Sequence, residues 1–227
     1  MNLLDFIFPK RCVSCGSFGR YLCSDCTAEI KFIEAPICPV CERPAIGGAA
    51  HPGCRTRYSL DGLISVCIYE GPVKMAIKRL KYKPWTTDLG KILADLAFSY
   101  LQNAPINYLI KAKPTVAPVP LHHDRERYRG FNQSEVLGRL LAGKLNLEVT
   151  ANVLIRHKKT KTQAELKGRE RLENIRGAFA LSRPYTPTRP FVLLIDDVWT
   201  TGATLKACCD VLKRAGVKKV WALVLAR

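Results

Sequence analysis

Apolar runs alternate with stretches of helical periodicity from residue 58 to residue 227. Short, mostly apolar runs typical of buried strands occupy residues 62–71, 115–121, 152–156, 191–195 and 219–227. Residues 72–82, residues 133–146 and the segment after residue 195 repeat apolar positions at the three- and four-residue spacing of a helix face. This alternation predicts an α/β fold, in which helices cover both faces of a parallel sheet.

The run FVLLIDDVWTTGATL (residues 191–205) ends one of these strands on two adjacent acids. In parallel sheets, ligands bind beyond the carboxyl ends of the strands, which is where Asp196 and Asp197 fall. Carboxylates in that position can accept hydrogen bonds from sugar hydroxyls, and they need no shifted pKa to do so. The acid pair therefore predicts a sugar site at this edge of the sheet.

The turn that follows the acids is suited to an anion. It leads into a helix, so its backbone N–H groups and the helix dipole favour negative charge. Gly202 permits a close approach or a positive φ angle, and hydroxyl donors are supplied by Thr200, Thr201 and Thr204. The turn and the acids together predict a sugar-phosphate site. The alternative is a connection in which the acids only cap the helix.

Seven of the ten cysteines fall between residues 12 and 54, mostly in pairs separated by two residues. A CxxC turn directs two thiolates at one point, and two such turns complete a tetrahedral zinc site. The simplest grouping gives two sites, Cys12/Cys15/Cys23/Cys26 and Cys38/Cys41/His51/Cys54. A cross-braced grouping of the first pair with the third stays open, and so do ordinary buried thiols or a redox motif.

We interpret the metal as structural Zn²⁺, because no grouping leaves an obvious open coordination position. Zinc would supply the folding free energy that so short a segment cannot obtain from an apolar core. The sequence thus predicts a small N-terminal zinc-ribbon domain over residues 1–57 and the α/β domain over residues 58–227. The remaining cysteines, Cys67, Cys208 and Cys209, are expected in the core.

The net charge of +17 is unevenly distributed: residues 111–176 carry 15 bases and 7 acids, and residues 177–227 carry 8 and 3. This excess favours phosphates, nucleic acid or a membrane surface as partners. The N-terminal MNLLDFIFPK is a poor signal peptide, because Asp5 interrupts it and no basic region precedes it. No run reaches the ~18 apolar residues of a membrane span. We therefore expect a cytoplasmic protein with reduced cysteines.

Two basic segments are candidates for anion binding. DRERYRGFNQS (residues 124–134) sets three arginines beside Gly130, ahead of a helix that Asn132 or Ser134 could cap. Arginine forks suit a diphosphate better than lysines do, and a solvated loop is the alternative. Residues 156–176 could form a mobile lid, a nucleic-acid surface or a soluble arm. In order of preference, the candidate contacts are 196–204, then Arg129, then Lys158 and Arg169.

The 191–205 run resembles the phosphoribosyl pyrophosphate (PRPP) motif of type I phosphoribosyltransferases: hydrophobic residues, Asp-Asp, Thr-Thr-Gly and a final Thr. Trp199 is the one unusual residue within it. The resemblance implies a type I phosphoribosyltransferase-like fold, with Asp196 and Asp197 on the ribose hydroxyls and Mg²⁺ accompanying PRPP. Around the 5′-phosphate it implies Thr200, Thr201, Gly202, Ala203 and Thr204.

The whole chain resembles the ComF/GntX family of competence-associated proteins. The resemblance rests on the Cys-rich head followed in order by RLKYKPW, PVPLHHDRERYRGFNQSEVLG and TQAELKGRERLENIRGAF. It implies that residues 119–121 form a pyrophosphate loop and that residues 156–176 form a mobile loop over PRPP. It also implies a cytoplasmic role in natural competence, in the processing or delivery of incoming single-stranded DNA.

Three functions stay open on this basis. The first is a PRPP-binding protein that handles single-stranded DNA together with competence proteins. The second is an active phosphoribosyltransferase, in which a nitrogen nucleophile displaces pyrophosphate from PRPP, although the sequence identifies no pocket for an acceptor. The third is an adaptor whose zinc ribbon docks a protein partner.

Overall fold

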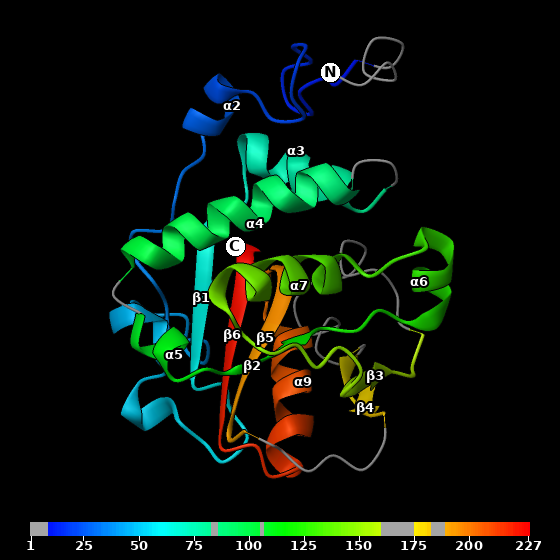
Figure 1. Ribbon diagram of the computed structural model, residues 1–227. Helices are drawn as coiled ribbons and strands as arrows, with labels where there is room; N and C mark the ends of the chain where they lie inside the picture. The colour runs from blue at the N-terminus through cyan, green and yellow to red at the C-terminus, as the bar shows by residue number, and fades with distance from the viewer. Residues whose placement is uncertain (1–8, 83–85, 105–106, 160–174, 183–188) are drawn as a thin grey trace.

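A parallel sheet forms the centre of the computed structural model, which describes residues 9–82, 86–104, 107–159, 175–182 and 189–227 (Figure 1). In these residues its four strands lie in the order β1-β6-β5-β2. Their bounds are β1 Gly62–Cys67, β2 Thr115–Pro118, β5 Phe191–Val198 and β6 Lys219–Ala226. The predicted class, an α/β protein with a parallel sheet flanked by helices, is confirmed.

Alternate residues of β5 contribute to two separate apolar cores, because successive side chains of a strand point to opposite faces. Leu193 and Ile195 join the core on one face, where α4 (Thr86–Asn103) and α7 (Gln133–Leu145) pack. Leu194 joins the other, which includes the apolar stripe of α9 (Ala203–Arg214). The sheet is therefore covered on both faces.

The strand predicted at residues 152–156 lies outside the central sheet. Its residues Leu154–Arg156 form β3, which pairs antiparallel with β4 (Phe179–Leu181) in a separate two-stranded sheet. Ile155 is exposed between two buried neighbours, so this strand alternates and is buried on one face only. Its inclusion in the parallel sheet was wrong for that reason.

The three arginines of DRERYRGFNQS lie on a short helix, α6 (His123–Arg129), and not in a loop. Gly130 ends α6 in the left-handed conformation at φ 77°. Asn132 then caps α7, since its side-chain oxygen accepts a hydrogen bond from the N–H of Ser134 at 3.0 Å.

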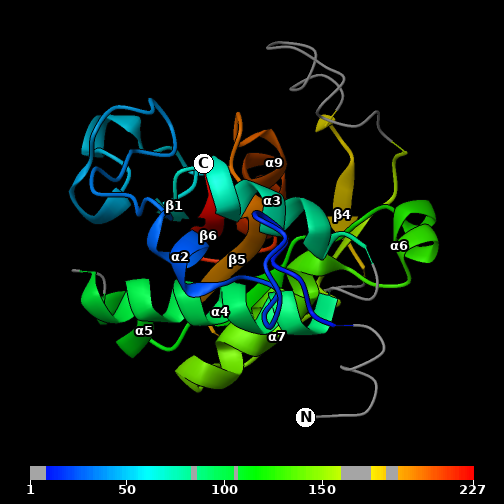
Figure 2. The ribbon, with the colours of Figure 1, turned by 90° about the horizontal axis from the view of Figure 1, so that it is seen from above.

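Two Cys-rich turns make up the N-terminal region, and each lies against a different part of the sheet domain. Figures 1 and 2 show the first turn, with α2 (Ser24–Ala28), beside α4 and α3 (Gly71–Leu80). The second turn carries the short helices η1 (Ile46–Gly48) and η2 (Pro52–Cys54) and lies beside β1. The short helix α5 (Asn107–Lys111) precedes β2.

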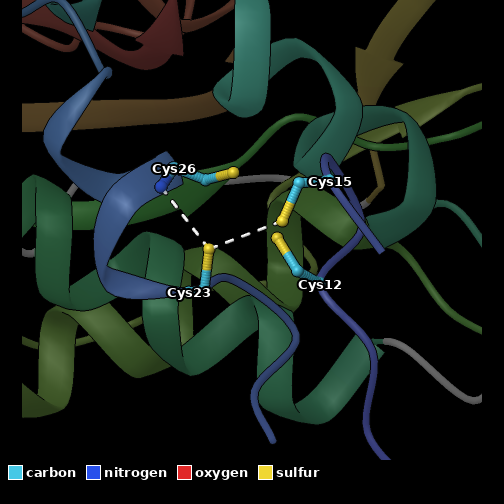
Figure 3. A group of neighbouring side chains, drawn as sticks. All are labelled: Cys12, Cys15, Cys23 and Cys26. Carbon is cyan, nitrogen blue, oxygen red and sulfur yellow. Dashed lines mark hydrogen bonds between the residues drawn. The ribbon is translucent and has the colours of Figure 1, made fainter. Parts of the chain in front are cut away.

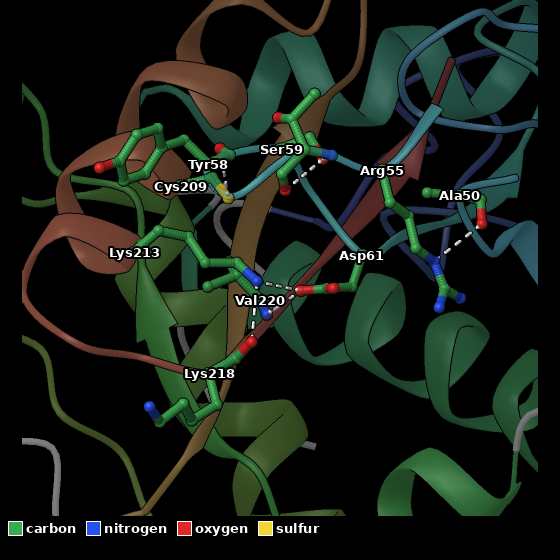
Figure 4. A network of polar contacts seen from close by, with 10 residues as sticks. Ala50, Arg55, Tyr58, Ser59, Asp61, Cys209, Lys213, Lys218 and Val220 are labelled. Carbon is green, nitrogen blue, oxygen red and sulfur yellow. Dashed lines mark hydrogen bonds and ion pairs between the residues drawn. The ribbon is translucent and has the colours of Figure 1, made fainter. Parts of the chain in front are cut away.

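A polar network joins the segment after the second turn to α9 and β6 (Figure 4). The Oδ2 atom of Asp61 accepts hydrogen bonds from Lys213 Nζ and from the N–H of Val220, each at 2.7 Å. Lys213 also donates to the carbonyl of Lys218 at 2.8 Å. Asp61, just after the predicted domain boundary at residue 57, is thus hydrogen-bonded to both α9 and β6. Across the described ranges, no helix has the length and apolar character needed to cross a membrane.

Candidate functional site

A cavity of about 530 Å³ opens beyond the carboxyl ends of β2 and β5. Ligands of parallel sheets bind in this position. Its walls come from the carboxyl ends of β1, β2 and β5, from α6, from β3 and from the residue after α3. The start of α7, the turn before α9 and the start of α9 complete the walls. They comprise Tyr69, Lys81, Val119, Pro120, Leu121, Arg125, Arg129, Gln133, Ser134, Arg156, Asp196, Asp197, Val198, Thr200 and Thr204. The predicted acid pair, part of the predicted turn and the predicted 119–121 loop thus line one space.

The two acids have different partners. Asp196 Oδ1 accepts hydrogen bonds from Ser134 Oγ and from the N–H of Asp197, both at 2.9 Å. Asp197 is buried and forms an ion pair with Lys81, whose Nζ lies 3.0 Å from Oδ2. Neither acid caps α9, because the N-cap position belongs to Gly202. The alternative of a purely capping role does not describe this site.

Burial raises the pKa of Asp196 to about 7, and the charge of neighbouring Asp197 adds to the effect. Hydrogen bonds from the Asp197 N–H and from Ser134 act in the opposite direction. For Lys81, burial lowers the pKa, but the charge of Asp197 and its contact outweigh burial and leave the pKa raised. The sequence prediction required no shifted pKa for sugar binding, and it gave no sign of the raised pKa of Asp196.

Only part of the 200–204 turn reaches the cavity. Thr200 and Thr204 line it, whereas Ala203 is buried and Thr201 is not among the lining residues; the Oγ1 atom of Thr201 accepts a hydrogen bond from the N–H of Ala203 at 3.4 Å. Gly202 has a φ angle of 68°, in the left-handed region that favours glycine.

Trp199 supplies a second reason for glycine at position 202. Its indole is buried, and a Cβ atom built on Gly202 would come within 2.2 Å of the ring. The Lys206 ammonium lies 5.2 Å from the centre of the same ring. The unusual residue of the motif is therefore a packing residue that fixes the shape of the turn.

The basic side chains of the cavity differ in part from those predicted. Arg129 lines it and donates to Gln133 Oε1 at 3.0 Å, and Arg125 lines it as well. Lys158 is exposed and does not line the cavity, and Arg169 lies outside the described residues.

Sequence reasoning missed two cations that line the cavity, Lys81 and Arg156. Arg156 is buried on β3, and burial, followed by the charge of Arg125, lowers its pKa. Arg156 begins the basic 156–176 segment, and Lys81 lies within RLKYKPW, so both residues lie in segments that the sequence predictions already use. The sequence pattern does not indicate that these two side chains point into the cavity.

The first cysteine set meets at a single point (Figure 3). The ligand atoms of Cys12, Cys15, Cys23 and Cys26 all lie within 4.8 Å of one another, and Cys15 Sγ is 3.6 Å from Cys23 Sγ. Zn–S bonds of about 2.3 Å in a tetrahedron place the sulfurs roughly 3.8 Å apart. The donor set and its spacing fit a structural zinc ion.

The second set joins Cys38, Cys41, His51 and Cys54 within the same limit. His51 Nδ1 lies 3.3 Å from Cys41 Sγ, and Nε2 lies 3.0 Å from the carbonyl of Pro44, a contact of the kind that orients zinc-binding histidines. A side-chain hydrogen bond from Arg43 is the main cause that lowers the pKa of Cys41 to about 6. The thiolate that zinc requires is thereby favoured. The cross-braced grouping is not the one that these contacts form.

A third group of potential ligands, His122, His123 and Asp124, follows β2. Lys159 Nζ lies 3.0 Å from Asp124 Oδ2, so a protein cation already occupies the carboxylate. His122 is buried and accepts a hydrogen bond from the N–H of Asp124 as the N-cap of α6. We interpret this group as an ion pair and a helix cap.

Comparison with known proteins bears on both parts of the chain. The family model of the double zinc ribbon domain matches residues 3–56. Competence protein F of Haemophilus influenzae is 32% identical over the whole of this chain and 99% of its own length. DNA utilization protein YhgH of Salmonella typhimurium is 30% identical, with 89% of each protein covered. Competence protein ComFC of Bacillus subtilis is 29% identical over 86% of this chain and 79% of its own length.

Proposed function

The chain belongs to the family of competence protein F, and from this premise we propose that it binds PRPP or a related sugar phosphate while handling single-stranded DNA. The names of the relatives supply the DNA part of the proposal. The cavity at the carboxyl end of the sheet supports the sugar-phosphate part. The N-terminal double zinc ribbon serves as a structural unit.

One observation carries the sugar-phosphate assignment: an acid pair, hydroxyl groups and arginines converge in a single cavity. Asp196 and Asp197 can accept hydrogen bonds from ribose hydroxyls, and Thr200 and Thr204 can donate to a phosphate at the start of α9. Arg125 and Arg129 lie across the same space and suit a diphosphate. The alternative of a solvated charged surface does not account for carboxylates, hydroxyl groups and arginines that all line one cavity.

Lys81 forms an ion pair with Asp197 at 3.0 Å, while Arg125, Arg129 and Arg156 give the cavity an excess of positive charge. A diphosphate ligand offers Lys81 a second anionic partner. PRPP would enter as its Mg²⁺ complex, and the metal would then be held chiefly by the ligand.

Calorimetric titration of the zinc-loaded protein with Mg²⁺ and PRPP tests this assignment. We expect the Asp196→Asn/Asp197→Asn variant to bind at least about tenfold more weakly, since two charge-assisted hydrogen bonds are lost. The matched control is Asp124→Asn/Asp210→Asn, which removes two acids that do not line the cavity. It should bind like the wild type. Equal binding by the acid-pair variant, or none by the wild type, would refute the assignment.

Catalytic turnover is tested separately, by measuring pyrophosphate release with the same protein. If bound PRPP releases pyrophosphate in the presence of a nitrogen base, and the acid-pair variant does not release it, the chain is an active phosphoribosyltransferase. If PRPP binds without release in a screen of bases, binding is the function of the site.

A further inference from the structure

A second groove, of about 510 Å³, lies at the opposite end of the sheet from the acid pair. Phe191 and Lys219, the first residues of β5 and β6, line it. Its other lining residues are Ala112, Lys113, Arg189, Pro190 and Lys218. Phe191 lines this groove and Asp196 lines the sugar-phosphate cavity, so five residues of β5, or roughly 17 Å, separate the two.

Three connections that are distant in sequence are hydrogen-bonded together to build this groove. Arg189 Nη1 donates to the carbonyl of Lys113 at 3.0 Å. The carbonyl of Pro190 accepts from the N–H groups of Lys218 and Lys219, at 3.0 and 2.9 Å. These bonds fix the backbone segments that carry the four cations and hold the Arg189 guanidinium itself in place.

The charge of the groove has one sign. Four of its seven lining residues are basic, and none of the seven is acidic. Glu148 is not among the lining residues, and its Oε2 lies 3.5 Å from Arg189 Nε. The cavity at the other end, by contrast, contains both Asp196 and Asp197 and suits a ligand with hydroxyl groups as well as phosphates. This groove suits a chain of phosphates.

An aromatic ring stands beside these cations. Tyr108 of α5 is 53% exposed, and Lys219 Nζ lies 5.9 Å from the centre of its ring. The same ammonium lies 5.0 Å from the ring of buried Phe191, which anchors it. An exposed ring next to phosphate-binding cations is a platform on which an unpaired base can stack. A paired base in a duplex offers no free face, so the arrangement favours a single strand.

We propose that this groove binds the backbone of single-stranded DNA, with a base stacked on Tyr108, at a site separate from the sugar-phosphate cavity. The inference rests on the DNA part of the proposed function. Among the described elements, the basic helix α6 is a poorer candidate for this role. Its Arg125 and Arg129 line the sugar-phosphate cavity, and Asp124 and Glu126 alternate with them.

Fluorescence anisotropy with a labelled oligothymidylate of about 16 nucleotides tests the groove. The variant Lys113→Glu/Lys218→Glu changes two exposed lysines, and we expect at least about a tenfold loss of affinity at moderate salt. The slope of log K against log salt should fall by about 1.4, because two phosphate contacts are lost at roughly 0.7 each. The control, Lys74→Glu/Lys78→Glu, makes the same change of net charge on the exposed side of α3. It should keep its affinity within about twofold.

A second variant separates stacking from charge. Tyr108→Ala should weaken binding about fivefold or more without changing the salt slope, and Tyr108→Phe should restore it. An oligomer of abasic sugar phosphates should not distinguish Tyr108→Ala from the wild type.

The PRPP titration keeps the two proposals apart. A groove variant that loses DNA and keeps PRPP supports a separate DNA site. If the groove variant and the α3 control lose the same affinity for the oligonucleotide, net charge alone attracts DNA. This result would overturn the proposal that the groove is the binding site. So would a wild type that binds PRPP but no oligonucleotide. RNA bound in preference to DNA of the same sequence would also overturn the choice of ligand.

Discussion

The N-terminal Cys-rich region and the sheet domain are each stabilised by different interactions. In the sheet domain, strands such as β5 place apolar side chains in cores on both faces, and Leu193 and Leu194 are almost fully buried. In the Cys-rich region, Leu22 and Ile30 are buried, but Ile46 is 96% exposed and Phe18 is 62% exposed. The sheet domain therefore folds by removing apolar surface from water, and the Cys-rich region, with its smaller apolar core, depends in addition on metal.

The two Cys-rich turns also differ from each other. Cys12 and Cys26 of the first turn belong to the same apolar core as the α4 and α7 side of the sheet. The second turn contributes only Ile37 to the opposite core and is followed by the Asp61 network. The first turn is thus attached by apolar contact, and the second largely by polar contact. This difference predicts that the second turn depends more on its own metal.

Metal removal should have the largest effect. Structural zinc contributes on the order of 10 kcal/mol of apparent binding free energy in small zinc domains. We expect Cys38→Ala to lose one of two bound zinc ions and to open residues 37–57 to protease, while the sheet domain stays folded. Zinc content by mass spectrometry and mapping of the cleavage sites measure both effects.

Cys67→Ala is the matched control, because Cys67 is a buried cysteine of β1 outside both ligand sets. It should retain two zinc ions. Full zinc content in Cys38→Ala, or loss of zinc from Cys67→Ala, would contradict the assignment of ligands.

The polar attachment of the second turn should give the next largest effect. Asp61→Asn leaves the Lys213 ammonium, whose side chain is only 8% exposed, without its charged partner. The expected loss of unfolding free energy is about 2 to 3 kcal/mol. Asp210 lies on α9, as Lys213 does, and forms an exposed ion pair with Arg214. Asp210→Asn breaks this pair and should lower the unfolding free energy by less than about 0.5 kcal/mol. If urea denaturation gave similar losses for the two variants, the Asp61 network would not be an important attachment.

Most of the fold and much of the site can be predicted from the sequence, because the patterns that indicate them lie within short segments. Each predicted strand of the sheet is an apolar run, each CxxC pair fixes its own turn, and the acids of 196–197 end a strand whose position in a parallel sheet is known. The double zinc ribbon and the α/β class needed no long-range information.

The errors concern contacts between distant segments. Lys81 and Asp197 are 116 positions apart, and no periodicity reports that they form an ion pair. The raised pKa of Asp196 depends on burial by surrounding elements, which a motif does not contain. β3 was placed in the wrong sheet because three residues carry too little pattern to specify a partner strand.

At Asp196, burial acts against stability, and this gives the smallest of the expected effects. The pKa of Asp196 is about 7 in the folded protein, against an ordinary value of 3.8, so the folded state holds the extra proton between these values. The group therefore costs no stability below about pH 4, and its cost grows as the pH rises to about 7. Above pH 7 the cost is constant.

Asp196→Asn should remove that cost while keeping an oxygen that accepts from Ser134 and from the N–H of residue 197. Since Asp196 is only half-buried, we expect a gain of about 1 to 2 kcal/mol at pH 8, or a few degrees in melting temperature, and little gain near pH 4. Denaturation curves of both proteins across this range measure the difference. A gain that did not grow with pH would mean that Asp196 ionises normally, and that the apolar burial which stabilises the sheet extends to the acid pair without penalty.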